Sequence, residues 1–245
     1  MRRRNKSLLT AGYLDKRISY CESVKRKADE MLLKWAYTDG TVYYLDRSQE
    51  EAEDSKGRSL GTHVWRRSDN RDAMYQECIG PSAYSKGQGT PCKVWGFLAC
   101  GVLHIHVLEE GESMDADLYT ELVDEKFDEW RGYCEYLVCD FERCLRTVAA
   151  KHALQKAGLK LVDNYPKSSQ DFNAIENVWG LLKERLNATQ PRTLEYRDAF
   201  INRLHAAVRW ANTHRAGQLK RWSTNQKERA QACLKTKPPG GRTIW

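Results

Sequence analysis

Residues 135–165, EYLVCDFERCLRTVAAKHALQKAGLKLVDNY, contain two short apolar runs separated by a helical pattern. The first run, 135–140, predicts a buried strand that ends in an acid, and the second, 159–165, predicts another strand. Residues 144–158 between them predict a helix. A helix that joins two strands of one sheet normally makes a crossover between parallel neighbours. This stretch therefore predicts parallel strands with a helix packed on the sheet.

The residues before this stretch predict the rest of the sheet. An apolar run over 32–45 is broken only at Asp39-Gly40, so we expect a strand that Asp39 ends or interrupts. Two strand-like runs, 92–100 and 102–108, have one glycine between them and predict an antiparallel hairpin. The whole order is strand, strand, strand, helix, strand, helix, strand, helix. It predicts an α/β fold with a mixed five-stranded sheet and helices on both faces.

Composition limits the class of protein. The chain has 245 residues, of which 41% are hydrophobic, enough for one large domain or for a domain with appendages. No apolar run is long enough to span a bilayer, and the amino terminus lacks the apolar stretch of a secretory signal. Eight cysteines form no CxxC pair, which predicts reduced thiols in a cytosolic or nuclear protein.

Charge is distributed unevenly along the chain. Residues 1–34 hold ten Lys or Arg and four Asp or Glu, residues 181–245 hold 14 and four, and the middle is acidic. Basic ends around an acidic middle favour contact with a polyanion such as nucleic acid, although a solvated surface has the same composition. We expect a basic, helical amino-terminal segment over 1–32 that lies outside the main core. A core domain over 33–190 and a basic helical region with a loose tail over 191–245 are expected to follow.

Three acids occupy special positions in this pattern. Asp39 lies in the first predicted strand, and Asp140 lies at the carboxyl end of a later strand, where ligands collect in sheets with parallel strands. Glu176 lies in the first turns of a helix predicted over 168–186, on the shoulder of its apolar stripe. Asp171 is the expected N-cap of that helix. A carboxylate at the margin of a core must meet a cation or shift its pKa.

Clustered carboxylates predict a site for divalent cations. Mg²⁺ takes oxygen ligands and often binds one or two carboxylates together with substrate phosphates. Two such ions can activate an attacking oxygen and stabilise a leaving oxygen in phosphoryl displacement. His104 and His106 share a face of one predicted strand, but without a third ligand an ordinary strand face is favoured over a metal site. Spacing alone does not separate catalytic acids from ordinary turn residues.

Four stretches resemble, in order, the catalytic domain of Tc/mariner-type transposases, which are DDE superfamily endonucleases. They are YTDGTVYYL (37–45), KVWGFLACGVLHIHVLEEGESMDADLYTELV (93–123), YLVCDFER (136–143) and YPKSSQDFNAIENVWGLLKERL (165–186). The last is the most specific, because it matches the family pattern of a proline, serines, an aspartate, an Asn-x-Ile-Glu-Asn-x-Trp core and a following Lys. The resemblance covers about residues 33–190, which is therefore the expected catalytic domain.

The resemblance implies an RNase H-like fold and a three-acid site that binds Mg²⁺ or Mn²⁺, with two ions expected. Matched by motif, Asp39 is the first acid, Asp140 the second and Glu176 the third. The implied activity is DNA cleavage and strand transfer by a DDE-type transposase. The implied partner is DNA, with a homodimer on the transposon ends and the nucleus as location. The basic run over 1–6 is a candidate nuclear-import signal.

Departures from the family pattern indicate a divergent copy. Asp39-Gly40 stands where the family usually has Asp-Glu, and FERCL follows Asp140 where the family usually has Asn and a nearby His. Only a short segment precedes the core, whereas these transposases normally carry an amino-terminal helix-turn-helix region, so we expect either a truncated copy or one that borrows its DNA targeting from elsewhere. Two rival functions stay open. One is an inactive or domesticated DNA-binding descendant, and the other is a different RNase H-like nuclease, for instance one that acts on RNA–DNA hybrids.

Two further segments are candidates for DNA contact. Trp65-Arg66 resembles the family's Val-Trp-Arg stretch, with a packing role as the equal alternative. Residues 214–237 predict a basic helix that contains Trp222, and phosphate contact is favoured there over a solvated amphipathic helix.

Overall fold

The computed structural model describes residues 11–46, 48–49, 89–140, 144–167, 169–191, 193–236 and 239–240. The expectations for the basic run 1–6 and for Trp65-Arg66 lie outside the described residues.

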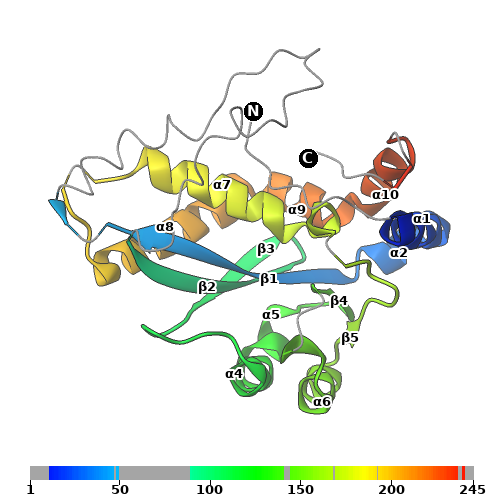
Figure 1. The fold of residues 1–245 in the computed structure, drawn as a ribbon, viewed down its shortest axis with the longest axis horizontal. Helices are drawn as coiled ribbons and strands as arrows, with labels where there is room; N and C mark the ends of the chain where they lie inside the picture. The colour runs from blue at the N-terminus through cyan, green and yellow to red at the C-terminus, as the bar shows by residue number, and fades with distance from the viewer. Residues whose placement is uncertain are drawn as a thin grey trace, which may run out of the picture.

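Five strands form one mixed sheet in the order β3-β2-β1-β4-β5 (Figure 1). Their bounds are β1 Trp35–Leu45, β2 Thr90–Ala99, β3 Val102–Val107, β4 Tyr136–Val138 and β5 Lys160–Leu161. β1 pairs antiparallel with β2, which forms a hairpin with β3, while β4 runs parallel to both β1 and β5. The predicted hairpin, the parallel pair and the mixed five-stranded sheet are therefore confirmed.

The first strand corrects one expectation, because it runs through Asp39-Gly40 without a break. Asp39 pairs with Gly96 of β2, and Gly40 pairs with Trp95. Glycine is tolerated inside this strand because the six-membered ring of Trp95 lies against it, where a Cβ on Gly40 would be only 3.1 Å from the ring. Asp39 thus neither ends nor interrupts the strand, and its backbone stays in the β1–β2 ladder.

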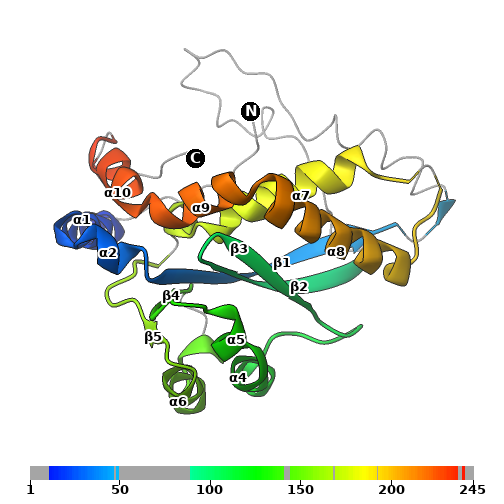
Figure 2. The same ribbon diagram turned by 180° about the vertical axis from the view of Figure 1, so that it is seen from behind.

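Helices cover both faces of the sheet, as Figures 1 and 2 show from opposite sides. One face carries α4 Ala116–Leu122, the π-helical turn Val123–Phe127, α5 Asp128–Trp130 and α6 Val148–Lys156, with a 3-10 turn Cys144–Arg146 before α6. The other face carries α7 Ile175–Ala188, α8 Arg197–His214 and α9 Ala216–Thr224. At one end of the sheet lie α1 Ala11–Arg26, α2 Asp29–Leu32 and α10 Gln226–Leu234. The predicted helices on both faces are confirmed.

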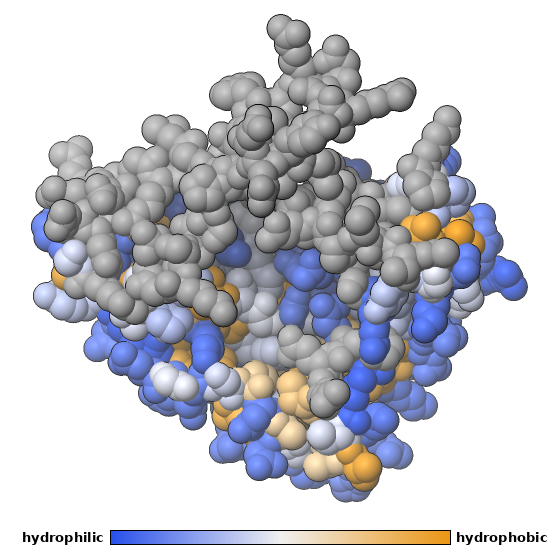
Figure 3. All heavy atoms as spheres, in the orientation of Figure 1, coloured by the Kyte–Doolittle hydropathy of each residue, from blue (hydrophilic) through white to orange (hydrophobic). Residues whose placement is uncertain are grey.

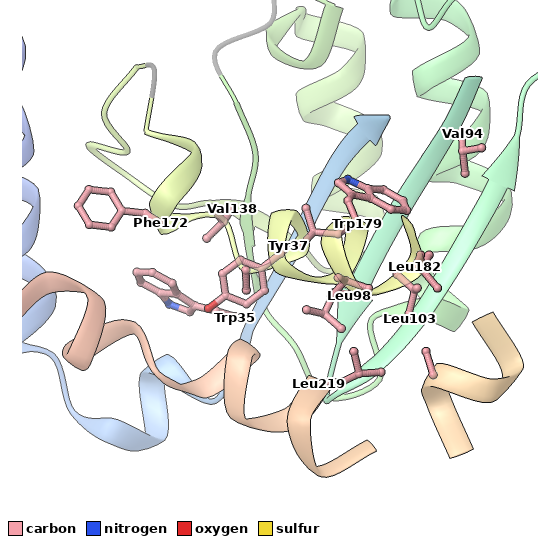
Figure 4. Close-up of a cluster of buried hydrophobic side chains, with 14 of the residues drawn as sticks. Trp35, Tyr37, Val94, Leu98, Leu103, Val138, Phe172, Trp179, Leu182 and Leu219 are labelled. Atoms are coloured by element: carbon pink, nitrogen blue, oxygen red, sulfur yellow. The ribbon is translucent and has the colours of Figure 1, made fainter. Parts of the chain in front are cut away.

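The core beneath α7 joins strands and helices from distant parts of the chain (Figure 4). Trp179 and Leu182 of α7 pack there with Leu98 of β2, and Leu219 of α9 closes the cluster from the other side. The apolar residues predicted to form one stripe are all buried, Phe172 in a 3-10 turn before α7 and the other five on α7 itself: Ile175, Val178, Trp179, Leu182 and Leu186.

Helix α1 belongs to this core, and the expectation that the segment over 1–32 lies outside it is wrong for the part that the structure describes. Tyr20, Cys21 and Val24 are buried in the same cluster as Trp35 of β1. In both ribbon views α1 lies beside α10, so the two ends of the described chain meet. The apolar stripe of α1 is short and charged residues surround it, which is why the sequence shows little amphipathic signal. The boundaries at residues 32 and 190 stay predictions.

The described surface is largely polar, as the space-filling view shows for the face of Figure 1 (Figure 3). This agrees with the mean hydropathy of −0.72. Among the described residues, no helix combines the length and the apolar character needed to cross a bilayer.

Candidate active site

The two aspartates lie side by side where β4 ends against the middle of β1. Tyr37 of β1 pairs with Val138, the last residue of β4, and Asp39 and Asp140 each come two residues later in sequence. β1 continues past this point to Leu45, so the parallel register brings Asp39, inside β1, next to Asp140 at the carboxyl end of β4, where ligands collect in such sheets.

Glu176 reaches the same edge because α7 lies unusually close to the sheet. Gly96, the strand partner of Asp39, leaves room for Ile175 and Trp179 of α7. A Cβ at Gly96 would stand 2.5 Å from Cζ2 of Trp179 and 2.9 Å from Cδ1 of Ile175. The first turn of α7 therefore rests directly on the strand beside Asp39, and Glu176 follows Ile175 in that turn.

The start of α7 differs from the sequence-based expectation. The helix begins at Ile175, its N-cap is Ala174, and no side chain caps it. Asp171 is not the cap, because it lies in a 3-10 turn, Gln170–Phe172, and forms an ion pair with Arg17 of α1 at 2.6 Å. This long-range ion pair satisfies the carboxylate more fully than a cap would.

Burial and mutual repulsion govern the electrostatics of the three carboxyl groups. Burial first, and then the charges of Glu176 and Asp140, raise the pKa of Asp39 to about 9, although the Gly40 N–H donates to its Oδ1 at 2.8 Å. Burial also raises the pKa of Glu176, and the charge of Asp140 adds to the increase, while a hydrogen bond to Asp39 and the charge of Lys183 oppose it. The three acids thus interact electrostatically, and burial together with this repulsion favours the protonated form of Asp39.

The carboxyl oxygens are chemically suited to Mg²⁺ or Mn²⁺, because a dication would replace the proton and relieve the repulsion. The described residues contain no group of three or more His, Cys, Asp or Glu side chains already arranged to hold one metal ion. The electrostatic coupling of the three acids is compatible with the lack of such a preformed group among the described residues. Charges interact over several ångströms, whereas a metal ligand must lie within about 2.0–2.6 Å of its ion. The donor set therefore fits ions that pairs of carboxylates bind together with water or phosphate oxygens.

The structure brings together all three acids that the sequence singled out, and their catalytic and metal-binding roles stay predictions. It adds residues that the sequence left unnoticed. Asn173 is wholly buried, and its Nδ2 donates to the carbonyl of Thr38, one residue before Asp39. The Asn-x-Ile-Glu pattern contained this signal, but only the fold shows what the asparagine holds. His104 packs its ring on Trp130, with ring centroids 5.3 Å apart, as expected of an ordinary strand face.

The sequence matches no known protein-family profile and gives no significant match to a curated protein. Comparison of structures does find similar folds. The catalytic domain of Mos1 mariner transposase aligns over 98% of this chain and 100% of its own length, with a TM-score of 0.66 and 10% identity. The Mos1 paired-end complex with the left transposon end aligns over 100% of this chain and 67% of its own, with a TM-score of 0.69 and 11% identity.

Mos1 catalytic-domain structures with Mn and with Mg, each with raltegravir, are similar too, both with a TM-score of 0.65 and 11% identity. They cover 98% and 97% of this chain, respectively, and 100% of their own length. Likeness at this level of identity concerns the fold. The chain therefore has the RNase H-like α/β fold of the Mos1 mariner transposase catalytic domain.

Proposed function

We propose that this chain is a DDE-type enzyme that cleaves DNA and transfers the liberated strand by in-line phosphoryl displacement. One observation carries the proposal: the charges of Glu176 and Asp140 raise the pKa of Asp39, and the charge of Asp140 raises the pKa of Glu176, so the three acids from two parallel strands and a helix lie close together. Perturbed carboxyl groups that cluster in this way are typical of functional sites. Solved structures of the same fold include a Mos1 strand transfer complex.

The three acids would hold the cations from different elements of the fold. Asp39 of β1 and Asp140 after β4 would be ligands of shared cations, and Glu176 would be a ligand of a second cation from the first turn of α7. The Gly40 N–H orients Oδ1 of Asp39. Two bound Mg²⁺ or Mn²⁺ ions would supply an activated attacking oxygen and charge neutralisation at the leaving oxygen.

DNA is the proposed partner, and the described carboxy-terminal helices offer cationic groups for its phosphates. Arg185 of α7 and Arg215 after α8 both lie over the ring of Trp210, at 4.7 Å and 5.4 Å from the centroid. Lys220 and Arg221 are exposed or half-exposed on α9. Such side chains bind a backbone of any sequence. A homodimer on DNA ends and a nuclear location complete the proposal.

The experiment is a nicking assay on supercoiled plasmid in Mn²⁺ and in Mg²⁺, followed by a strand-joining assay on duplexes with pre-cut ends. Asp39→Asn, Asp140→Asn and Glu176→Gln should each remove both activities. Asp128→Asn is the matched control, because that side chain is 76% exposed and pairs with a neighbouring arginine, Arg131, on the surface. It should retain full activity.

The outcomes separate the three functions. DNA binding without cleavage by the wild type, under all metal conditions, would indicate an inactive DNA-binding descendant. Cleavage of RNA–DNA hybrids in preference to duplex DNA at matched salt would indicate a different nuclease of this fold. If activity survives Asp140→Asn, the carboxylate trio is not the catalytic centre.

A further inference from the structure

Two wholly buried arginines converge on the segment that carries Glu176. Arg17 comes from α1 and Arg229 from α10, and both have 0% exposed surface. Arginine is rarely buried so completely unless it is paired. Each reaches more than 50 positions along the chain, to residues 169–177. The segment that opens α7 is therefore attached to both ends of the described chain.

Arg17 binds the beginning of this segment. Its Nη1 donates to Ser169 Oγ at 2.7 Å and to Asp171 Oδ1 at 2.9 Å, and its Nη2 donates to Asp171 Oδ2 at 2.6 Å. The guanidinium also lies 4.5 Å from the centre of the Phe172 ring. Nε donates to the carbonyl of Gly240 at 2.6 Å. This two-pronged geometry fixes orientation as well as distance.

Arg229 contacts both the beginning and the end of the segment. Its Nη1 donates to the carbonyl of Asp171 at 2.7 Å, and its Nη2 donates to Oδ1 of Asn177 at 2.8 Å. A neighbouring residue of α10, Gln226, donates from Nε2 to the carbonyl of Phe172 at 3.0 Å. Asn177 directly follows Glu176, so one of these hydrogen bonds ends beside the acid.

The opposite side of the segment is attached to the sheet. Asn173 Nδ2 donates to the carbonyl of Thr38 at 3.2 Å, and Thr38 precedes Asp39. The segment is thus held between α1 and α10 on one side and β1 on the other. Asn173 and Asn177, the two anchored side chains, stand on either side of Glu176 in the chain.

We propose that Arg17 and Arg229 are positioning residues that hold Glu176 against Asp39 and Asp140. The inference rests on the proposed function, since it assigns the arginines to the same carboxylate site. α7 has no side-chain cap, so its own sequence does not fix where the helix starts. The two arginines instead fix residues on both sides of the acid, Asp171 before it and Asn177 after it.

If the two arginines only stabilised the fold, apolar side chains of similar size would serve as well, because buried ion pairs contribute little net stability. What the arginines add is a defined geometry at one place. Removing residues that orient metal ligands typically weakens metal binding by about 10–100-fold. The same loss is expected here if the arginines orient Glu176.

The test uses the full chain without DNA. Mn²⁺ binding is titrated by electron paramagnetic resonance for the wild type, Arg17→Lys and Asn177→Ala. Arg17→Lys keeps the charge and loses the two-pronged contact, and Asn177→Ala removes the acceptor of Arg229 without leaving a charge unpaired. Both should bind Mn²⁺ at least about tenfold more weakly than the wild type.

Arg203→Lys is the matched control. Arg203 is also a partly buried, ion-paired arginine, and its Nη1 donates to the carbonyl of Leu186 at 2.7 Å, at the far end of α7. Leu186 lies ten positions from Glu176, about 15 Å along the helix. This variant should lose stability as the others do but keep its Mn²⁺ affinity within about twofold. Melting temperatures of all variants give the stability comparison.

Hydrogen exchange provides a readout that needs no metal. The amides of residues 175–177 should exchange faster in Arg17→Lys and Asn177→Ala, while those of residues 183–187 keep the protection they have in the wild type. Wild-type Mn²⁺ affinity and unchanged exchange at 175–177 in Asn177→Ala would overturn the inference, whether or not Arg17→Lys folds. A wild type that binds no Mn²⁺ would instead refute the proposed function, and hydrogen exchange would still decide whether the arginines hold this segment.

Discussion

Replacing Gly96 by alanine tests whether the contact between α7 and β2 sets the position of Glu176. Gly96 lies inside a regular strand, so alanine brings no strain in the backbone. Its Cβ would stand 2.5 Å from Cζ2 of Trp179 and 2.9 Å from Cδ1 of Ile175. Ordinary carbon contacts are about 3.5–4.0 Å, so the helix must move away by about 1 Å.

The magnitude follows from this displacement. Overpacking of a tight core costs about 1–3 kcal/mol, which should appear as a lower urea midpoint with an unchanged m-value. A misplacement of about 1 Å at a reacting group costs about a hundredfold in rate. We therefore expect Gly96→Ala to lower Mn²⁺-dependent nicking by about a hundredfold at a temperature at which the protein stays folded.

Two further variants make the result interpretable. Gly217→Ala places a Cβ with nothing within 4 Å on α9, so it should be neutral or stabilise by up to about 1 kcal/mol. Trp179→Phe removes the ring atoms that collide with the new methyl group, and the pair Gly96→Ala and Trp179→Phe should be less damaging than the sum of the single changes. Wild-type stability together with wild-type nicking in Gly96→Ala would refute the idea that this contact positions Glu176.

Three other outcomes follow from the site and its surroundings. The pKa of Asp39 in the folded protein, about 9, lies above its ordinary value of 3.8, so the fold favours the protonated carboxyl group. Without metal, the contribution of Asp39 to the free energy of unfolding is therefore full below about pH 4 and is lost as the pH rises towards about 9. Melting in EDTA should show this fall, which Asp39→Asn should abolish, and parallel profiles for the two proteins would contradict the assignment. Added Mn²⁺ should raise the wild-type melting temperature more at about pH 8 than at about pH 6, because a cation competes with the proton, and an equal increase at both values would count against binding at Asp39. Arg215→Gln, which removes a cation from the ring of Trp210, should weaken duplex DNA binding and lower its salt-dependence slope by about one, whereas an unchanged slope would exclude a phosphate contact there.

Parts of the sheet could be predicted because short-range patterns encode them. The hairpin between β2 and β3 follows from two apolar runs and a tight turn, at which Cys100 and Gly101 adopt positive φ. The parallel pairing of β4 with β5 follows from the helical crossover between them. The parallel pairing of β1 with β4, which sets Asp39 beside Asp140, joins residues far apart in the chain, and only the family resemblance implied that these acids share one site. The apolar stripe of α7 places Glu176 on the margin of the core.

The parts that could not be predicted depend on partners far away in the chain. Asp171 is a residue type favoured at N-caps, but Arg17, 154 positions away, pairs with it, and the N-cap of α7 is Ala174, three residues later. Helix α1 has a sequence rich in charged residues, yet one of them, Arg17, is wholly buried. Local propensity assigns such a residue to the surface, and only the tertiary ion pair reverses the assignment.

The departure at Gly40 illustrates how a change of sequence next to the site is absorbed. The resemblance leads one to expect an acid after Asp39, yet a Cβ at position 40 would lie 3.1 Å from Cζ3 of Trp95, closer than side chains normally approach. Gly40 and the buried indole of Trp95 are therefore a matched pair across β1 and β2. The Gly40 N–H still donates to Asp39 Oδ1, so this backbone contact with the first acid is retained without the extra carboxylate. The divergence at this position thus lies in the packing of the ladder, while Asp39, Asp140 and Glu176 remain within electrostatic reach of one another.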